Sequence, residues 1–283
     1  MQQRLYDEQV KAVGDIAIAA GQVASAPFLP RPLAIVETLG LTLNEAVQPG
    51  STEERLVTGT KALRPALKRG RGGEISGVIL PFEELELTAK ALARLHTSSV
   101  RPDELTPRTG AKEAKRARER AALICSHNPT MAVDVQLLAQ ELATRLAVLQ
   151  PDIYRPAHGG FKASQLLFHS HQVFVVDFDG FCLADAALDV GYFLAYLRPS
   201  GLWYDRPVMR QWFEEAADAF IGSYRRAMAA SGVSEAAIDG ILQRSRLYEA
   251  ALLLKIATRR VNRLNSPRSK ELSSMLREIA ACL

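Results

Sequence analysis

His158-Gly159-Gly160-Phe161-Lys162-Ala163-Ser164-Gln165 is the stretch that decides the fold, together with Asp177-Phe178-Asp179-Gly180, whose Asp177 lies twelve residues after Gln165. Between these stretches, residues 165–168 (QLLF) and 173–177 (VFVVD) are short apolar runs, which predict two strands joined by a turn over residues 169–172. The carboxylate at the end of the second strand then faces the loop before the first strand. The sequence therefore predicts a polar site at one end of a β-hairpin.

The polar residues of this hairpin suit phosphoryl transfer to a hydroxyl. That reaction needs a group that orients or deprotonates the hydroxyl, a cation near the moving phosphoryl group, and oxygen ligands that hold Mg²⁺ on the nucleotide phosphates. Lys162 supplies a cation, Gln165 an amide oxygen and Asp177 a carboxylate. Because Asp177 follows the apolar run VFVV, burial of this carboxylate without a partner or a metal would be costly.

Each of these residues also has a structural interpretation. Asp177 could cap the turn that follows its strand, Gln165 could bond to nearby backbone, and Lys162 could be a solvated surface lysine. His169 and His171 form a His-x-His pair in the predicted turn, where an exposed turn is favoured over a metal site because two histidines alone are a weak signal.

Three segments, HGGFKASQ (158–165), VVDFDG (175–180) and ADAALDVG (184–191), resemble the aminoglycoside/choline phosphotransferase family of the protein-kinase fold. That family's catalytic loop reads HGDxxxxN or HGDxxxxQ, and its metal-binding strand ends in D-[FW]-[DE]. The resemblance implies an α+β, protein-kinase-like two-lobe fold, with a curtailed N-terminal lobe and a mainly helical C-terminal lobe. It places His158 at the structural histidine of the loop and Asp189 at the helix aspartate that steadies the loop.

The resemblance also implies cofactors and roles. ATP and Mg²⁺ would be bound, with Gln165 and Asp177 as metal ligands and Lys162 near the transferred phosphate. Upstream, FLPRPLAIV (28–36) and LTLNEAVQPG (41–50) resemble the family's fourth strand and interlobe hinge. On that alignment the backbone of Glu45, Ala46 and Val47 faces the adenine. ALARLHTSSV (91–100) resembles the family's helix that ends in a Leu-His pair.

The sequence departs from the family pattern at Gly160, which stands where the family carries its catalytic aspartate. Glycine has no side chain to orient a hydroxyl or accept its proton, and loss of a positioned general base costs about 10²- to 10⁴-fold in rate. Asp179 is the nearby acid that we consider as a catalytic substitute.

A second departure lies at the N-terminus. Arg4 falls at the family's strand-lysine position, where arginine keeps the charge but not the compact ammonium group. Only 44 residues precede Glu45, and the phosphate-covering hairpin expected before Arg4 has no residues. We expect either a truncated reading of a longer gene or a lineage that has lost this hairpin.

The chain divides near residue 50 into two expected parts. Residues 1–50 form a partial N-terminal lobe and hinge, with a strand pair over 33–36 and 41–47. Residues 51–283 form a helical C-terminal lobe that contains the catalytic-loop hairpin. Apolar periodicity predicts helices over residues 7–20, from Glu84 to His96, and over 132–149 and 206–231. Further helices are expected over 111–125, 186–197, 235–264 and 268–282.

Composition narrows the function classes. Apolar content of 48% and charged content of 23% are those of a globular protein, and a net charge of +4 is too small to argue for nucleic-acid binding. The basic loop over 62–77, with Lys68, Arg69 and Arg71, lacks interleaved aromatic residues and is expected to be solvated.

Three separated cysteines predict neither a zinc site nor disulfides. The lack of a signal peptide or an apolar span predicts a cytoplasmic protein that does not bind membranes.

Two functions remain open. The first is a divergent phosphotransferase that moves the γ-phosphate of ATP to a hydroxyl of a small-molecule acceptor. The second is a pseudokinase that serves as a binding or scaffolding module. The glycine at position 160 favours the second, and the retained Gln165 and Asp177 favour the first.

Overall fold

The computed structural model of the chain describes residues 28–36, 41–47, 80–100, 107–169, 171–198, 207–261 and 269–283. Three of the sequence predictions, the helix over 7–20, the role of Arg4 and the basic loop over 62–77, lie outside the described residues.

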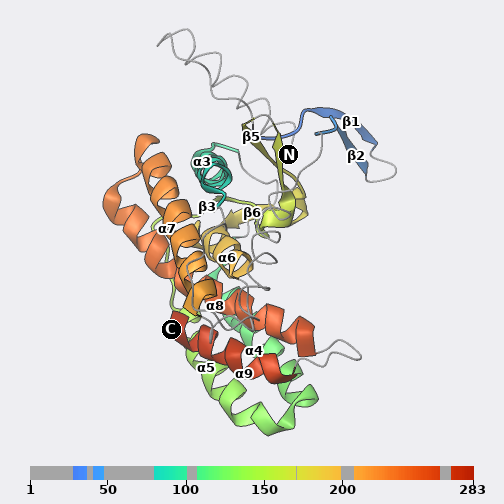
Figure 1. Ribbon diagram of the computed structural model, residues 1–283, viewed down its shortest axis with the longest axis vertical. Helices are drawn as coiled ribbons and strands as arrows, with labels where there is room; N and C mark the ends of the chain where they lie inside the picture. The colour runs from blue at the N-terminus through green and yellow to red at the C-terminus, as the bar shows by residue number, and fades with distance from the viewer. Residues whose placement is uncertain are drawn as a thin grey trace.

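The strands described form three two-stranded antiparallel sheets (Figure 1). Strand β1 (Pro32–Val36) pairs with β2 (Leu41–Asn44), and β4 (Leu166–His169) pairs with β5 (Gln172–Val175), which confirms both predicted strand pairs. Strand β5 ends two residues before Asp177, because Asp177 adopts a left-handed backbone conformation with φ of 66°. The third pair, β3 (Arg155–Ala157) with β6 (Cys182–Ala184), was not predicted, since three-residue strands carry no periodic signal.

Helices make up most of the remaining described structure. They are α3 (Phe82–Thr97), α4 (Gly110–His127), α5 (Ala132–Ala147), α6 (Ala187–Leu197), α7 (Pro207–Ala230), α8 (Glu235–Val261) and α9 (Ser269–Cys282), with short 3₁₀ turns η2 (Pro129–Met131), η3 (Ala163–Gln165) and η4 (Phe178–Gly180). All correspond to predicted helices except the 3₁₀ turns. Helix α4 packs on α5, α6 on α8, α3 on α7 and α8 on α9. Figure 1 shows β1–β2 and α3 towards one end of the molecule and α4, α5 and α9 at the other.

Helix α6 lies in the centre of the core. It buries Tyr192, Phe193 and Leu194, and the Phe193 ring packs on Phe220 of α7 with a centroid separation of 4.3 Å. A helix buried on all sides needs small residues where another backbone approaches. Gly191 meets this need, since a Cβ built there would lie 2.4 Å from the carbonyl oxygen of Ser245 in α8.

We predict that Gly191→Ala lowers the free energy of unfolding by about 1–3 kcal/mol, because the added methyl forces α6 and α8 apart. Gly222→Ala in α7 is the matched control: there the new Cβ has only an ordinary 3.5 Å contact with the end of the Arg226 side chain. The control is expected to stabilise the helix by about 0.5–1 kcal/mol. Urea denaturation of both variants measures the difference, and equal effects would refute the close packing of α6 on α8.

Among the described residues, no helix is both long enough and apolar enough to cross a membrane.

Candidate active site

The start of the loop over residues 158–165 is held in place by one buried carboxylate, that of Asp189. Asp189, at the start of α6 and 0% exposed, accepts hydrogen bonds from the backbone N–H of His158 (2.6 Å) and of Gly159 (2.9 Å). His158 Nε2 in turn donates to the carbonyl oxygen of Val176 (2.9 Å) and so ties the loop to the segment after β5. These contacts give Asp189 and His158 the loop-holding positions that the resemblance implies.

A second set of contacts supports Asp189. His96, at the end of α3, lies 3.4 Å from the Asp189 carboxylate and hydrogen-bonds through its other ring nitrogen to Tyr224 (2.7 Å). Burial by itself raises the pKa of Asp189, but the hydrogen bond and charge of His96 and the contacts with His158 outweigh burial, so the pKa is lowered. The sequence indicated His96 only as the end of a helix. The structure shows it buried beneath the loop.

Gly159 is required by close contact with the turn after β5. Its φ is +76°, and a Cβ there would lie 2.0 Å from the Gly180 carbonyl oxygen, so the loop rests directly on the DFDG segment. The Gly159 carbonyl accepts a hydrogen bond from Arg108 Nη1 (2.7 Å). Sequence reasoning missed Arg108, because it precedes Gly159 by 51 residues and belongs to no motif.

The structure brings two of the predicted site residues together. Gln165 Nε2 donates to Asp177 Oδ2 at 2.6 Å. Asp177 holds its left-handed conformation (φ 66°, ψ 59°) at an exposed position, a backbone strain that is typical of functional sites. The other amide atom, Gln165 Oε1, is buried and accepts no hydrogen bond from any residue that the structure describes.

The side-chain oxygens of Asp177 and Gln165 are of the kind that binds Mg²⁺. The ion prefers oxygen ligands and is usually held by one or two protein side chains with phosphates and water completing the shell. The exposed Asp177 carboxylate and the buried Gln165 amide oxygen, which has no partner among the described residues, are ligands of this type, although the amide nitrogen is the atom that faces the carboxylate in the structure. Across the described ranges, no group of three or more His, Cys, Asp or Glu side chains could form an all-protein metal cage. Two side chains leave most of the coordination shell of such an ion to other ligands.

Of the other predicted site residues, Lys162 contacts this pair through its backbone: its carbonyl oxygen accepts a hydrogen bond from the Gln165 N–H (3.0 Å). Lys162 is half-buried, and its Nζ lies 5.8 Å from the Tyr196 ring centroid of α6. Asp179 is exposed in η4. Glu45 and Ala46 are exposed and Val47 is half-buried directly after β2. Their catalytic and adenine-binding roles stay predictions.

A Cβ at Gly160 would meet only Gln165 Nε2 at 3.9 Å and His158 Nδ1 at 4.0 Å, both ordinary contacts. The structure thus has room for a side chain at the position where the carboxylate is missing.

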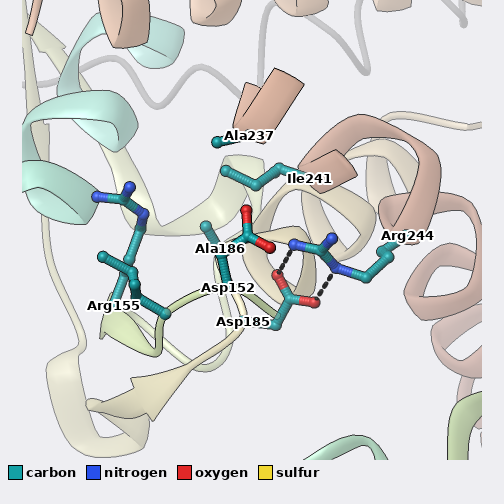
Figure 2. A pocket seen from close by; sticks show the side chains of 8 residues that line it. Asp152, Arg155, Asp185, Ala186, Ala237, Ile241 and Arg244 are labelled. Carbon is teal, nitrogen blue, oxygen red and sulfur yellow. Dashed lines mark hydrogen bonds and ion pairs between the residues drawn. The ribbon is translucent and has the colours of Figure 1, made fainter. Parts of the chain in front are cut away.

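The segment before α6 contains a second ion pair, outside the loop. Asp185 accepts hydrogen bonds from Arg244 Nε (2.6 Å) and Nη2 (3.2 Å), and Figure 2 shows this pair on one side of a pocket with Arg155 on the other. The free volume of the pocket is about 10 Å³, which holds one water molecule at most. The pair therefore links the segment after β6 to α8.

Comparison with known proteins identifies the family. Residues 59–230, more than half of the chain, match the sequence model of the phosphotransferase enzyme family, abbreviated APH. The chain belongs to the phosphotransferase enzyme family. No curated protein sequence matches this phosphotransferase-family chain.

Solved structures similar to this phosphotransferase-family protein are small-molecule kinases. A glucosamine kinase in complex with glucosamine, ADP and inorganic phosphate superposes with a TM-score of 0.60 at 20% identity, over 98% of this chain and 68% of that one. A choline/ethanolamine kinase family protein from Mesorhizobium loti gives 0.56 at 13% identity, over 99% and 78%. The ADP-bound aminoglycoside phosphotransferase APH(2'')-Ib gives 0.50 at 12% identity, over 99% and 83%.

These comparisons confirm the predicted family and the kinase-like α+β fold with a mainly helical C-terminal lobe. This phosphotransferase-family chain spans about two thirds of the length of the glucosamine kinase chains.

Proposed function

We propose that the chain binds ATP together with Mg²⁺ through Gln165 and Asp177, and that it transfers the γ-phosphate only slowly to a hydroxyl of a small molecule. The observation that carries this proposal is the Gln165–Asp177 contact: the amide nitrogen of Gln165 donates to an exposed carboxylate on a left-handed backbone, and the amide oxygen is buried without a partner among the described residues. Family membership and the nucleotide-bound structures of similar proteins support the choice of ligand.

Each residue near the Gln165–Asp177 pair would have its own role in phosphoryl transfer. Magnesium, when bound, would offset the charge of the nucleotide phosphates. Lys162 would approach the transferred phosphate by leaving the Tyr196 ring, and the backbone of Glu45 to Val47 would hold the adenine. Asp179 is the remaining acid of the loop region that could orient an acceptor hydroxyl. The slow rate follows from Gly160, which offers no positioned base.

The second candidate function is a pseudokinase that binds nucleotide or a partner without transfer. Gly160 is the specific observation that favours it, because every loop-holding contact of Asp189 is retained while the reactive side chain is missing. Such a chain would keep the fold of the site and use it for recognition.

Calorimetric titration of the full chain with MgATP tests the proposed function. We expect saturable binding of MgATP. The affinity should fall at least about tenfold in Asp177→Ala, because the metal would lose a ligand. It should fall by at least as much when EDTA removes Mg²⁺ from the nucleotide. Asp218→Ala, an exposed carboxylate on α7, is the matched control and should leave the affinity unchanged. Failure to bind at millimolar nucleotide would refute the proposal, and binding without measurable transfer to any acceptor would favour the pseudokinase.

A further inference from the structure

A group of basic side chains gathers where α4 and α8 pack together. Glu113, Arg116 and Arg120 share one face of α4 through their i, i+3, i+7 spacing, and this face meets α8, since Arg120 Nη1 donates to the carbonyl oxygen of Ala251 (3.0 Å). One and two turns further along the same face of α8 lie Lys255 and Arg259. Helix packing therefore brings basic residues from two helices into one place.

The ring of Tyr192 in α6 connects this face to the catalytic loop. The Arg108 guanidinium lies 5.3 Å and Lys255 Nζ 5.7 Å from the Tyr192 ring centroid. Arg108 also donates to the Tyr192 hydroxyl (2.5 Å) and, through another nitrogen, to the carbonyl of Gly159. We call these five basic residues the α4–α8 cationic cluster: Arg108, Arg116, Arg120, Lys255 and Arg259.

Among the described residues, the carboxylate that pairs with this cluster is that of Glu113. Glu113, 0% exposed, accepts hydrogen bonds from Arg108 (2.7 Å) and from Arg116, both through Oε1. Burial, reinforced by the charges of Arg259, Arg120 and Arg108, lowers the pKa of Lys255 to about 8. Like charges held in a half-buried place destabilise the protein unless an anion joins them.

A second observation points to a ligand with a hydrogen-bond donor. The other carboxylate oxygen, Glu113 Oε2, is buried and has no hydrogen-bond partner in the part of the chain that the structure describes. A buried oxygen of this kind costs free energy until a donor reaches it. Arg116, with a side chain 45% exposed, and the exposed Arg259 lie at the solvent side of the cluster, where a small molecule can approach.

We propose that the α4–α8 cationic cluster binds the oxyanion, carboxylate or phosphate, of a small molecule whose neighbouring hydroxyl or amine donates to Glu113. Arg108 belongs to this cluster and also donates to the Gly159 carbonyl oxygen, so a molecule bound at Arg108 lies close to the loop that carries Gly160. Resting on the proposed function, the same molecule is the acceptor, which therefore carries an acidic group as well as the hydroxyl that is phosphorylated.

Calorimetry without nucleotide tests this site by itself. The full chain is titrated at constant ionic strength with inorganic phosphate and, in a separate series, with acetate. We expect saturable binding of at least one anion, weakened at least about tenfold in Lys255→Met and in Arg259→Met. Lys115→Met removes a charge from the opposite, exposed side of α4, where the lysine side chain is 79% exposed, and should bind like the unaltered chain.

Stronger binding of phosphate than of acetate assigns a phosphorylated ligand, and the reverse assigns a carboxylic acid. Arg259→Met keeps the test valid if Lys255→Met does not fold, because Arg259 is exposed. Absence of binding by both anions, or binding that persists in the folded variants, overturns the proposal. Because no nucleotide is present, failure of MgATP binding to the chain leaves this result unaffected.

Discussion

Gly160→Asp is expected to raise the rate of phosphoryl transfer from MgATP by about 10²- to 10⁴-fold, the usual contribution of a positioned general base. The new Cβ would stand in ordinary contact with Gln165 and His158, at 3.9 and 4.0 Å, so the backbone need not move. The loop is already fixed by Asp189 at the two preceding residues. The variant would supply the carboxylate to a loop whose support is retained.

Release of ADP, measured with a panel of amino sugars, amino alcohols and hydroxy acids, gives the rate. Gly160→Asn is the matched control, because the amide fills the same space but is a far weaker base. We expect Asn to leave the rate near that of the unaltered chain. Equal activation by Asn and Asp would show that the side chain acts through packing, and no activation by Asp with any acceptor would refute the idea that only the base is missing.

Asp189→Ala is expected to lower the free energy of unfolding by about 3–5 kcal/mol, since it removes one partner of a buried charged network. The backbone N–H groups of His158 and Gly159 would lose their acceptor, and His96 would lose its contact with the carboxylate. A typical domain is stable by about 5–15 kcal/mol, so the loss is large. Asp218→Ala should change stability by less than about 0.5 kcal/mol.

The pH dependence of the free energy of unfolding distinguishes the contribution of the Asp189 charge from that of its packing. Because the folded pKa of this carboxyl is lowered, its stabilising contribution is complete above the unfolded pKa of about 3.9 and disappears as the pH falls through the folded pKa. Asp189→Asn should therefore be least stable relative to the unaltered chain near neutral pH, with a difference that shrinks in acid. A difference independent of pH would contradict an ionised Asp189. Urea midpoints at several pH values provide the measurement.

Local sequence patterns predicted the hairpin and the helices. The strands β4 and β5 alternate or run apolar between polar turns, and α5 and α7 have apolar residues at helical spacing. The β3–β6 pair gave no such signal, as each strand has three residues and the partners are separated by the whole hairpin. Such strands are defined by tertiary pairing and not by their own residues.

The candidate site was predictable where the motif is continuous. Gln165 and Asp177 share a short hairpin, so their contact follows from local register. Arg108 and Glu113 lie five residues apart around the start of α4, and Lys255 lies far along the chain in α8. In the sequence all three resemble ordinary charged residues. Only the packing of α4 on α8 and of Arg108 on Gly159 shows that they meet.

A crystal structure of the full chain with Mn²⁺ and a non-hydrolysable ATP analogue would show whether Asp177 and Gln165 bind the metal of the nucleotide. We expect anomalous scattering from manganese within coordination distance of Asp177, with the Gln165 amide oxygen turned towards the ion. A nucleotide bound elsewhere, or a metal that leaves Asp177 bonded only to Gln165, would contradict this expectation.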